Sequence, residues 1–238
     1  IDIRDPGYRY SVFEYQRDFV RVLTDLRGRD KFPVVCGGSG MYIDSVVSGY
    51  RLPEVPPDPD LRKKLEDKTI EELTAILSTY RKLHNFTDID TRKRAVRAIE
   101  IEKYLADHRE TIAAFPVSNP LVIGVLYSRD VRRERITARL RARLEAGMIG
   151  EVQGLLDRGT DPETLIYYGL EYKYITLYLT GRLDYDEMTR SLEIAIHQFA
   201  KRQMTWFRGM ERKGVVIHWI DGEMTTDKKV EFVIRLLE

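Results

Sequence analysis

An apolar run, a glycine-rich turn and a helix-forming segment follow one another between residues 32 and 49. FPVVC has the length of a buried strand, GGSG at residues 37–40 follows it, and MYIDSVVSG reads as a helix that stops near Gly49. Strand, glycine loop and helix in this order predict a parallel α/β unit. The single cysteine, Cys36, ends the apolar run, so we expect it to be a small buried core residue.

Two later apolar runs, LVIGVLY at 121–127 and VVIHWI at 215–220, predict further strands of this α/β layer. Four prolines between residues 53 and 59 halt regular structure, and the pattern from there to about residue 109 is helical. Ser11 and Thr69 each precede a glutamate by three residues, which predicts helices that begin with a capping box. We expect an α/β core of residues 1–52 and 116–238, rich in helices toward its end, and a helical insertion domain at 53–115.

Composition places the chain among ordinary globular proteins. Its 238 residues are 43% hydrophobic and 32% charged, which is enough to bury a large core. No run of eighteen apolar residues occurs, and the first residues, IDIRDPGYRY, resemble neither a signal peptide nor a transit peptide. We therefore expect a cytoplasmic monomer that does not enter a membrane. The net charge is only +1, so any evidence for a nucleic-acid partner must come from local clusters of cations.

The segment Gln198–Arg212 has two different faces when it is placed on a helix. The apolar face consists of Leu192, Ala195, Ile196, Phe199, Trp206 and Met210. The opposite face carries no acid and consists of Gln198, Lys201, Arg202, Thr205, Arg208 and Arg212. Surface helices usually mix charge signs, so a stripe of one sign indicates a polyanionic partner; an ordinary exposed polar face is the alternative.

Arginines crowd the segment 129–143, which holds seven of them against two acids. Four recur every three or four residues and share one side of a helix, namely Arg132, Arg135, Arg139 and Arg143. Such a row can hold a diphosphate or follow a nucleic-acid backbone, because guanidinium groups pair with phosphate through two hydrogen bonds. The alternative is a solvated helix with internal ion pairs such as Arg141 with Glu145. We favour one arginine at a ligand and the others in solvent.

The glycine loop is a second candidate for an anion site. Backbone amides at a helix N-terminus attract phosphate, glycines allow it to approach closely, and the Ser39 hydroxyl can add a hydrogen bond. A glycine-rich turn can equally serve only the backbone conformation of the connection. The residues alone leave both interpretations open.

Six ordered motifs resemble the tRNA dimethylallyltransferases of the IPP transferase family, and the resemblance extends from Ile1 to about Trp219. They are YSVFEYQRDF, PVVCGGSGMYIDSVVSG, RKRAVRAIEI, EAGMIGEVQGLL, YYGLEYK and QFAKRQMTWFR. The resemblance implies a P-loop-NTPase-like parallel sheet and a helical insertion that clasps the tRNA anticodon stem-loop. It also implies transfer of a dimethylallyl group from dimethylallyl diphosphate to N6 of adenosine 37, with Mg²⁺ accompanying the pyrophosphate. The adenine must leave its stack to react.

The resemblance also implies roles for particular residues. Gly37, Gly38, Ser39 and Gly40 match a loop near the diphosphate, with Ser39 and Arg135 as the catalytic candidates and Arg139 as a further diphosphate ligand. Arg62 matches a tRNA-contacting arginine at the mouth of the insertion. Segments 93–97, 166–173 and 201–208 supply the other expected tRNA contacts, which are Lys93, Arg94, Arg97, Tyr168, Gly169, Lys173, Lys201, Arg202, Gln203, Thr205, Trp206 and Arg208.

The sequence departs from the family pattern at its beginning. The family opens with a GxxxxGK[ST] phosphate loop and a DSxQxY-type segment whose aspartate acts on the adenine, and this sequence starts downstream of both. We expect the main Mg²⁺ ligands to lie in that segment. We also expect an incomplete sheet with exposed apolar surface and no prenyl transfer by this chain alone. Asp90 and Thr91 stand where Asn-Asp is expected.

Three functions are compatible with these residues. The first is a prenyltransferase represented by part of its length. The second is a tRNA-binding module or inactive paralogue without catalytic activity. The third is the related adenylate isopentenyltransferase, which modifies free nucleotides and would not need the basic stripe at residues 201–208.

Overall fold

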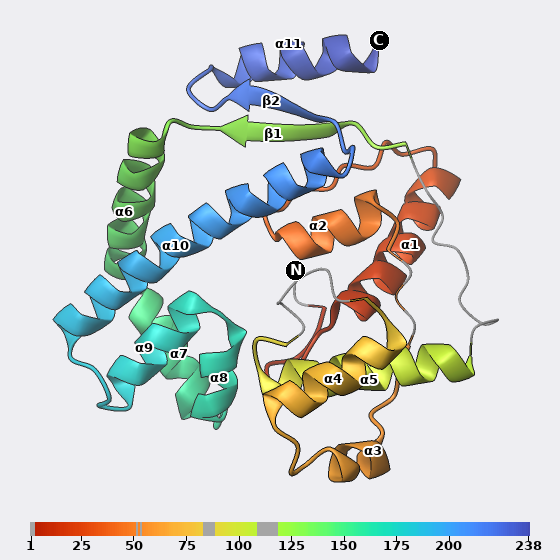
Figure 1. Cartoon of the computed structure of the whole chain (residues 1–238). Helices are drawn as coiled ribbons and strands as arrows, with labels where there is room; N and C mark the ends of the chain where they lie inside the picture. The colour runs from red at the N-terminus through yellow and green to blue at the C-terminus, as the bar shows by residue number, and fades with distance from the viewer. Residues whose placement is uncertain (1–2, 51, 53, 83–88, 109–118) are drawn as a thin grey trace.

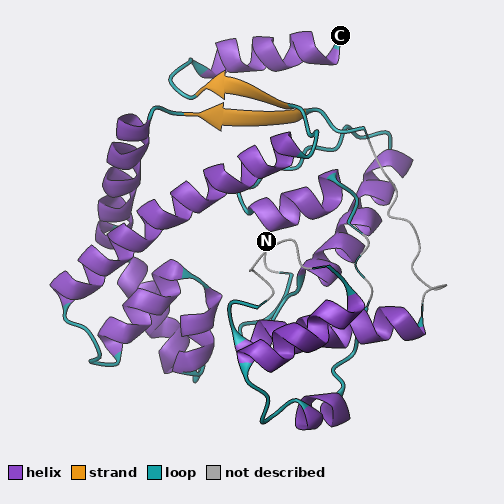
Figure 2. Cartoon of the chain, viewed as in Figure 1, coloured by secondary structure: helices purple, strands orange, loops and turns teal. Residues whose placement is uncertain are grey.

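The computed structural model describes residues 3–50, 52, 54–82, 89–108 and 119–238, and within them helices dominate (Figure 1, Figure 2). The N-terminal part contributes α1 (Val12–Gly28) and α2 (Gly40–Val47). The expected insertion contains α3 (Pro59–Lys64), α4 (Ile70–Tyr80) and α5 (Arg92–Asp107). The remainder consists of β1 (Val122–Leu126), α6 (Arg129–Glu145), α7 (Met148–Asp157), α8 (Pro162–Tyr168), α9 (Leu170–Leu179), α10 (Tyr185–Arg212), β2 (Ile217–Asp221) and α11 (Thr226–Leu237).

The two described strands, β1 and β2, pair in parallel, and α10 and α11 lie on opposite sides of them (Figure 1). Both strands arise from the apolar runs that predicted them. Gly124 lies opposite Trp219 in the register, and a Cβ atom at Gly124 would lie 2.5 Å from the Trp219 ring. The glycine therefore makes room for the indole. A mixed α/β architecture with a small parallel sheet confirms the expected fold class in its coarser form.

The expected strand at residues 32–36 is not formed. This segment has no regular secondary structure, and Phe32, Val34 and Val35 are 73%, 79% and 54% exposed. Cys36 is also exposed, so the prediction of a buried cysteine is wrong. The physical reason is that a strand depends on hydrogen bonds from a neighbour, and the described sheet holds only β1 and β2. The expected exposure of apolar surface is confirmed here.

The helix starts that the sequence predicted are confirmed. The Ser11 hydroxyl accepts a hydrogen bond from the Glu14 backbone N–H at 3.2 Å, and the Glu14 carboxylate accepts one from the Ser11 backbone N–H at 2.9 Å. Thr69 and Glu72 form the same reciprocal pair at the start of α4. Each pair satisfies amides that would otherwise have no partner within the helix.

Two apolar cores hold the helices together. One joins α6 to α10 through residues such as Leu140, Val152, Leu165, Ile175 and Leu192, which are all buried. The other joins α3, α4 and α5 through Leu65, Leu73, Leu77, Ala95, Ala98 and Ile99. Hydrogen bonds from Arg62 to Glu100 and from Arg97 to the Val55 carbonyl connect distant parts of the segment 54–108 to one another. The insertion boundaries near 53 and 115 involve residues outside the described part and stay a prediction. No described helix is long and apolar enough to cross a membrane.

Candidate functional site: the glycine loop and the basic helices

The glycine loop lies against α10. The Gln203 amide Nε2 donates to the Gly38 carbonyl at 2.7 Å, and a Cβ atom at Gly40 would lie 2.6 Å from Cγ of Trp206. None of the four loop residues has a positive φ. Gly38 and Gly40 therefore allow the close approach of α10 and do not serve an unusual backbone conformation. Ser39 occupies the N-cap position of α2, where its exposed side chain makes no capping hydrogen bond.

Behind this loop, the buried Asp44 of α2 collects hydrogen bonds from both helices. Its carboxylate accepts hydrogen bonds from Ser48 Oγ at 2.6 Å, from Tyr50 Oη at 2.5 Å and from Trp206 Nε1 at 3.1 Å. Lys213 Nζ lies 3.4 Å away. Burial alone would raise the pKa of Asp44, but these hydrogen bonds and the Lys213 charge outweigh burial and hold that pKa below its ordinary value.

The predicted basic face of α10 is exposed in full. Its members are Gln198, Lys201, Arg202, Thr205, Arg208 and Arg212. Within the described part of the chain, Lys201, Arg208 and Arg212 form no ion pair, and the Arg202 guanidinium lies 5.9 Å from the centre of the Phe199 ring. On the apolar face Leu192, Ala195, Ile196 and Met210 are buried as predicted.

One residue of that apolar face is not where the sequence placed it. Phe199 is 41% exposed, because it falls between the core of α6–α10, which ends at Ile196, and the contacts with α2, which begin at Gln203. Gln203 and Trp206, expected to contact tRNA, use their polar side-chain atoms within the protein.

Three arginines of the insertion, Arg62, Arg94 and Arg97, are engaged by carboxylates. Arg62 makes two hydrogen bonds to Glu100, of 2.6 and 2.9 Å, and Arg97 adds one of 2.9 Å. The Glu100 side chain is fully buried. Burial would raise the pKa of Glu100, but Arg62 and Arg97 lower it further than burial raises it. Arg94 pairs with Asp90. Lys93 is exposed and has no ion-pair partner among the described residues.

Arg135 lies at the edge of the sheet where the strands end. Its guanidinium is 4.8 Å from the centre of the Tyr127 ring, and Tyr127 directly follows β1. A Cβ atom at Gly222, just after β2, would lie 2.4 Å from that ring. Ligands of open parallel sheets bind outside the carboxyl ends of the strands. Arg135 therefore lies at the end of the sheet where ligands of this fold class bind.

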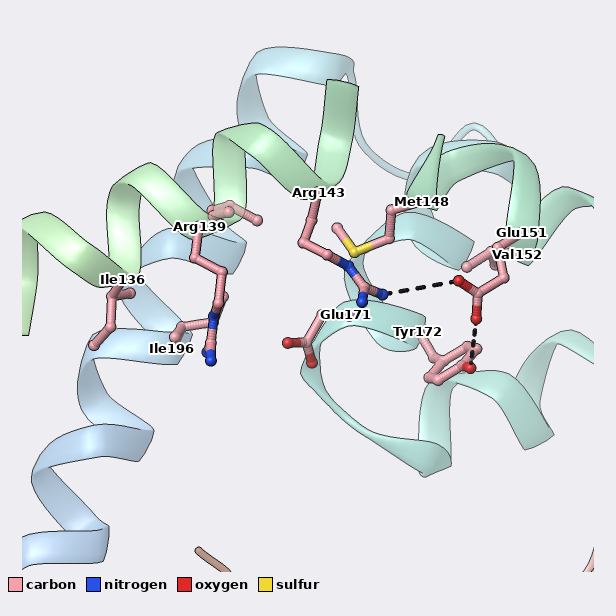
Figure 3. A pocket seen from close by; sticks show the side chains of 10 residues that line it. Ile136, Arg139, Arg143, Met148, Glu151, Val152, Glu171, Tyr172 and Ile196 are labelled. Carbon is pink, nitrogen blue, oxygen red and sulfur yellow. Dashed lines mark hydrogen bonds and ion pairs between the residues drawn. The ribbon is translucent and has the colours of Figure 1, made fainter. Parts of the chain in front are cut away.

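Arg139 lines a cavity of about 300 Å³ between α6, α7, α9 and α10. Its floor is apolar and includes Leu140, Met148 and Val152. Figure 3 shows the side chains of Arg139, from α6, and Glu171, from α9, among those that line it, and no ion pair joins these two described residues. Arg143 lies 3.8 Å from Glu151, which also accepts the Tyr172 hydroxyl at 3.0 Å. The alternative pair of Arg141 with Glu145 is not formed in the described structure.

The junction of α8 and α9 carries the remaining tRNA candidates. Gly169 has φ 156° and ψ −178°, a backbone conformation essentially restricted to glycine. The Tyr168 hydroxyl contacts the backbone of Gly7, and Lys173 Nζ lies 5.2 Å from the centre of the Tyr174 ring. This junction therefore lies beside the N-terminal segment and presents a lysine next to an aromatic ring.

The structure brings some of the predicted site residues together and leaves others apart. Gly38 and Gly40 contact Gln203 and Trp206, so the glycine loop and α10 form one surface. No contact is recorded between Ser39 and Arg135, which belong to α2 and α6. The described residues hold no cluster of three carboxylate, histidine or cysteine side chains, and Asp44 is already occupied by four donors.

Sequence reasoning missed Asp44, Glu100 and Tyr127. Asp44 occurs four residues after the glycine loop, and the pair Asp44–Ser45 has an apolar residue on each side. An acid in such a position indicates a buried carboxylate with hydrogen-bond partners. Glu100 stands in the same way between apolar residues in RAIEI. Tyr127 carries no local signal, because its role depends on the packing of Gly222 after a strand nearly a hundred residues away.

A parallel α/β layer joined to arginine-rich helices, with a glycine loop beside a cationic helix, defines an α/β protein with surfaces suited to phosphate groups. The chain belongs to the IPP transferase family, whose model matches residues 1–210. The members of this family that it resembles are tRNA dimethylallyltransferases, which are prenyltransferases, and the expected family and enzyme class are confirmed.

Curated relatives match along the whole chain. It is 58% identical to tRNA dimethylallyltransferase 2 of Phocaeicola vulgatus over 100% of this chain and 77% of that protein. It is 55% identical to tRNA dimethylallyltransferase 1 of Parabacteroides distasonis, with the same coverage.

Solved structures agree. The full-length tRNA isopentenylpyrophosphate transferase of Bacillus halodurans superposes with a TM-score of 0.67 at 28% identity, covering 100% of this chain and 76% of that one. A eukaryotic dimethylallyltransferase described as acting on tRNA superposes with a TM-score of 0.73 at 16% identity, covering 98% and 64%, which shows a shared fold.

Proposed function

We propose that this chain takes part in the transfer of a dimethylallyl group from dimethylallyl diphosphate to N6 of adenosine 37 in tRNA. The observation that carries the proposal is the exposed single-sign face of α10, which adjoins the glycine loop through Gln203 and Trp206. A polyanion and a diphosphate could thus be held by one continuous part of the molecule. The tRNA named for the curated relatives supplies the polyanion.

The chemistry requires that diphosphate be stabilised as it leaves. N6 attacks the first allylic carbon, a carbon–nitrogen bond forms, the carbon–oxygen bond breaks, and the electron pair departs with pyrophosphate while N6 loses a proton. Backbone amides at the start of α2, the Ser39 hydroxyl and the Arg135 guanidinium are donors for the growing negative charge. We assign no acceptor for the N6 proton, since Asp44 is enclosed by its own donors.

Among the tRNA candidates, we propose that Lys201, Arg202, Thr205 and Arg208 contact the backbone of the anticodon stem-loop directly. Lys93 and Lys173 serve as further contacts from the insertion and from α9. Arg62, Arg94 and Arg97 reach the RNA only with the N–H groups that their carboxylate partners leave exposed. Arg139 contacts the diphosphate of the prenyl donor from the cavity wall, one helical turn from Arg135.

Binding and transfer assays test this function. The anticodon stem-loop should bind the 238-residue chain with an affinity that falls steeply with salt. Arg202→Glu should weaken that binding more at low salt than at high salt, and equal binding by variant and parent would refute the assignment. A protein of the length of the curated relatives should transfer the prenyl group, and its Arg135→Ala variant should not.

Two other functions remain to be separated from this one. A non-catalytic tRNA-binding module would show the same RNA affinity without transfer by any longer form. An adenylate isopentenyltransferase would use free nucleotide and show little salt-sensitive affinity for RNA. We expect no transfer by the 238-residue chain alone, because it contains no GxxxxGK[ST] phosphate loop. Product formed by this chain would overturn that expectation.

A further inference from the structure

The helix α10 is anchored at two separate places. Its 28 residues extend over about 42 Å, and its first half packs into the core of α6–α9 through Met188, Leu192 and Ile196. Beyond Ile196 the helix leaves that core. Its second half, which carries the basic face, contacts Trp219 of β2, whose Nε1 donates to Glu211 at 2.8 Å and whose ring lies 6.5 Å from that of Phe207. The other contacts of this half are with the glycine loop and α2.

Those contacts centre on one carboxylate. Asp44 has a fully buried side chain and accepts the indole N–H of Trp206 at 3.1 Å, while the Lys213 ammonium lies 3.4 Å away, at the C-cap of α10. Trp206 and Lys213 are separated by seven residues, or about two turns, so they mark the side of α10 that faces α2. Arg208, two residues after Trp206, therefore points away from α2, whereas Arg202, four residues before Trp206, lies near the side that faces α2.

The two helices also fit each other closely around Asp44. Trp206 lies on Gly40, where no side chain larger than hydrogen has room, and Gln203 holds the Gly38 carbonyl. Ser48 and Tyr50 complete the set of donors from the α2 side, and the Tyr50 hydroxyl is 3.0 Å from Lys213 Nζ. Because the Asp44 side chain is fully buried, loss of a donor would leave part of its charge without a hydrogen bond, which is costly.

We propose that Asp44 is a positioning residue for RNA binding, which acts by holding Trp206 and Lys213 and so orients the basic face of α10. The inference rests on the proposed function in that this face must bind RNA. Asp44 itself does not touch the RNA. Its effect is transmitted by the rigid second half of the helix.

The test measures the affinity of the chain for an anticodon stem-loop RNA in Asp44→Asn, Trp206→Phe, Arg208→Ala and their pairwise combinations. Asp44→Asn keeps the shape of the side chain and removes its charge, and we expect a loss of about tenfold, or about 1.4 kcal/mol. Trp206→Phe keeps a ring on Gly40 but removes the N–H group, and we expect a similar loss. The Asp44–Trp206 and Asp44–Arg208 double variants should lose less than the sum of the single losses.

A spectroscopic measurement reports the same attachment without RNA. In a Trp219→Phe background the fluorescence comes from Trp206 alone, since the chain has two tryptophans. This background lacks the hydrogen bond from Trp219 to Glu211 of α10, so each variant is compared with the background protein and not with the parent. Asp44→Asn should shift this emission. Ser48→Ala is the comparison: it removes a hydrogen bond to Asp44 from the α2 side but leaves Trp206 and Lys213 in contact with the carboxylate, so its emission shift and its loss of RNA affinity should both be clearly smaller than those of Asp44→Asn.

The possible results distinguish a wrong role for Asp44 from a wrong RNA-binding role for α10. If Asp44→Asn lowers the melting temperature but leaves RNA affinity unchanged, or if its effect adds fully to that of Arg208→Ala, Asp44 is merely structural and the inference is wrong. If Arg208→Ala and Arg202→Glu also leave RNA affinity unchanged, the proposed function of α10 fails first. Should Asp44→Asn not fold, Trp206→Phe and Lys213→Met, each combined with Arg208→Ala, decide the question by the same criterion.

Discussion

The insertion and the second half of α10 are both rich in cations, yet they use them differently. In the insertion, Arg62 and Arg97 hold the buried Glu100, and Arg94 pairs with Asp90. On α10, Lys201 and Arg208 are exposed without an ion-pair partner among the described residues. A guanidinium that already neutralises a carboxylate has less to offer a phosphate. Clustering of basic residues in a sequence therefore does not reveal which of them are available to RNA.

The largest effect should come from breaking the network of the insertion. Glu100→Gln removes the charge that Arg62 and Arg97 share, and we expect a loss of about 2–3 kcal/mol in the free energy of unfolding. This is less than the ~3–5 kcal/mol of fully buried pairs because both arginines are partly exposed. Urea denaturation measures it. Glu71→Gln, an exposed acid of α4, is the control and should change stability by no more than about 0.5 kcal/mol. Equal effects would mean that the network does not stabilise the insertion.

A somewhat smaller effect should come from loosening the attachment of α10. Gly40→Ala places a Cβ atom 2.6 Å from Trp206, and we expect destabilisation of about 1–2 kcal/mol. Gly150 lies in α7 with open space around it, so Gly150→Ala should be neutral or stabilise by up to about 1 kcal/mol. Thermal unfolding of both variants compares them. A neutral Gly40→Ala would show that Trp206 moves aside at no cost.

Low pH should lower the stability of both the insertion and the attachment of α10, by less than the two substitutions above. Burial is outweighed by hydrogen bonds and by cations at Asp44 and Glu100, so both folded pKa values lie below the ordinary ones. A lowered pKa contributes stability above the unfolded value, about 3.9 for Asp and 4.3 for Glu, and this contribution is lost as the pH falls through the folded pKa. Because Asp44 and Glu100 stay ionised from pH 5 to pH 7, they should not change the melting temperature over that range. Below about pH 4 the melting temperature should fall. In Glu100→Gln the decline should be shallower; an unchanged decline would contradict the role of Glu100.

Local features of this fold could be predicted from the sequence. The capping boxes at Ser11 and Thr69, the strands at 122–126 and 217–221, and the two faces of α10 follow from spacing within a few residues. The strand at 32–36 could not be judged, because strand formation depends on a neighbour that the segment itself does not specify.

The candidate site was predictable in its residue types and not in its contacts. The sequence places glycines in the loop and cations on α10, but the pairing of Glu100 with Arg62 joins residues 38 positions apart. The attachment of Asp44 to Trp206 joins residues 162 positions apart. Such long-range contacts decide which cation is free, and no local pattern encodes them.

The central claim is that the free cations of α10, more than the paired ones of the insertion, bind the anticodon stem-loop. The most direct measurement is the salt dependence of RNA affinity for Arg208→Ala beside Arg94→Ala, two single exposed arginines that differ in having a carboxylate partner. Removing one phosphate contact should lower the slope of log affinity against log salt by about one. We predict that loss for Arg208→Ala and a clearly smaller one for Arg94→Ala. The reverse order, or an unchanged slope for Arg208→Ala, would contradict the account.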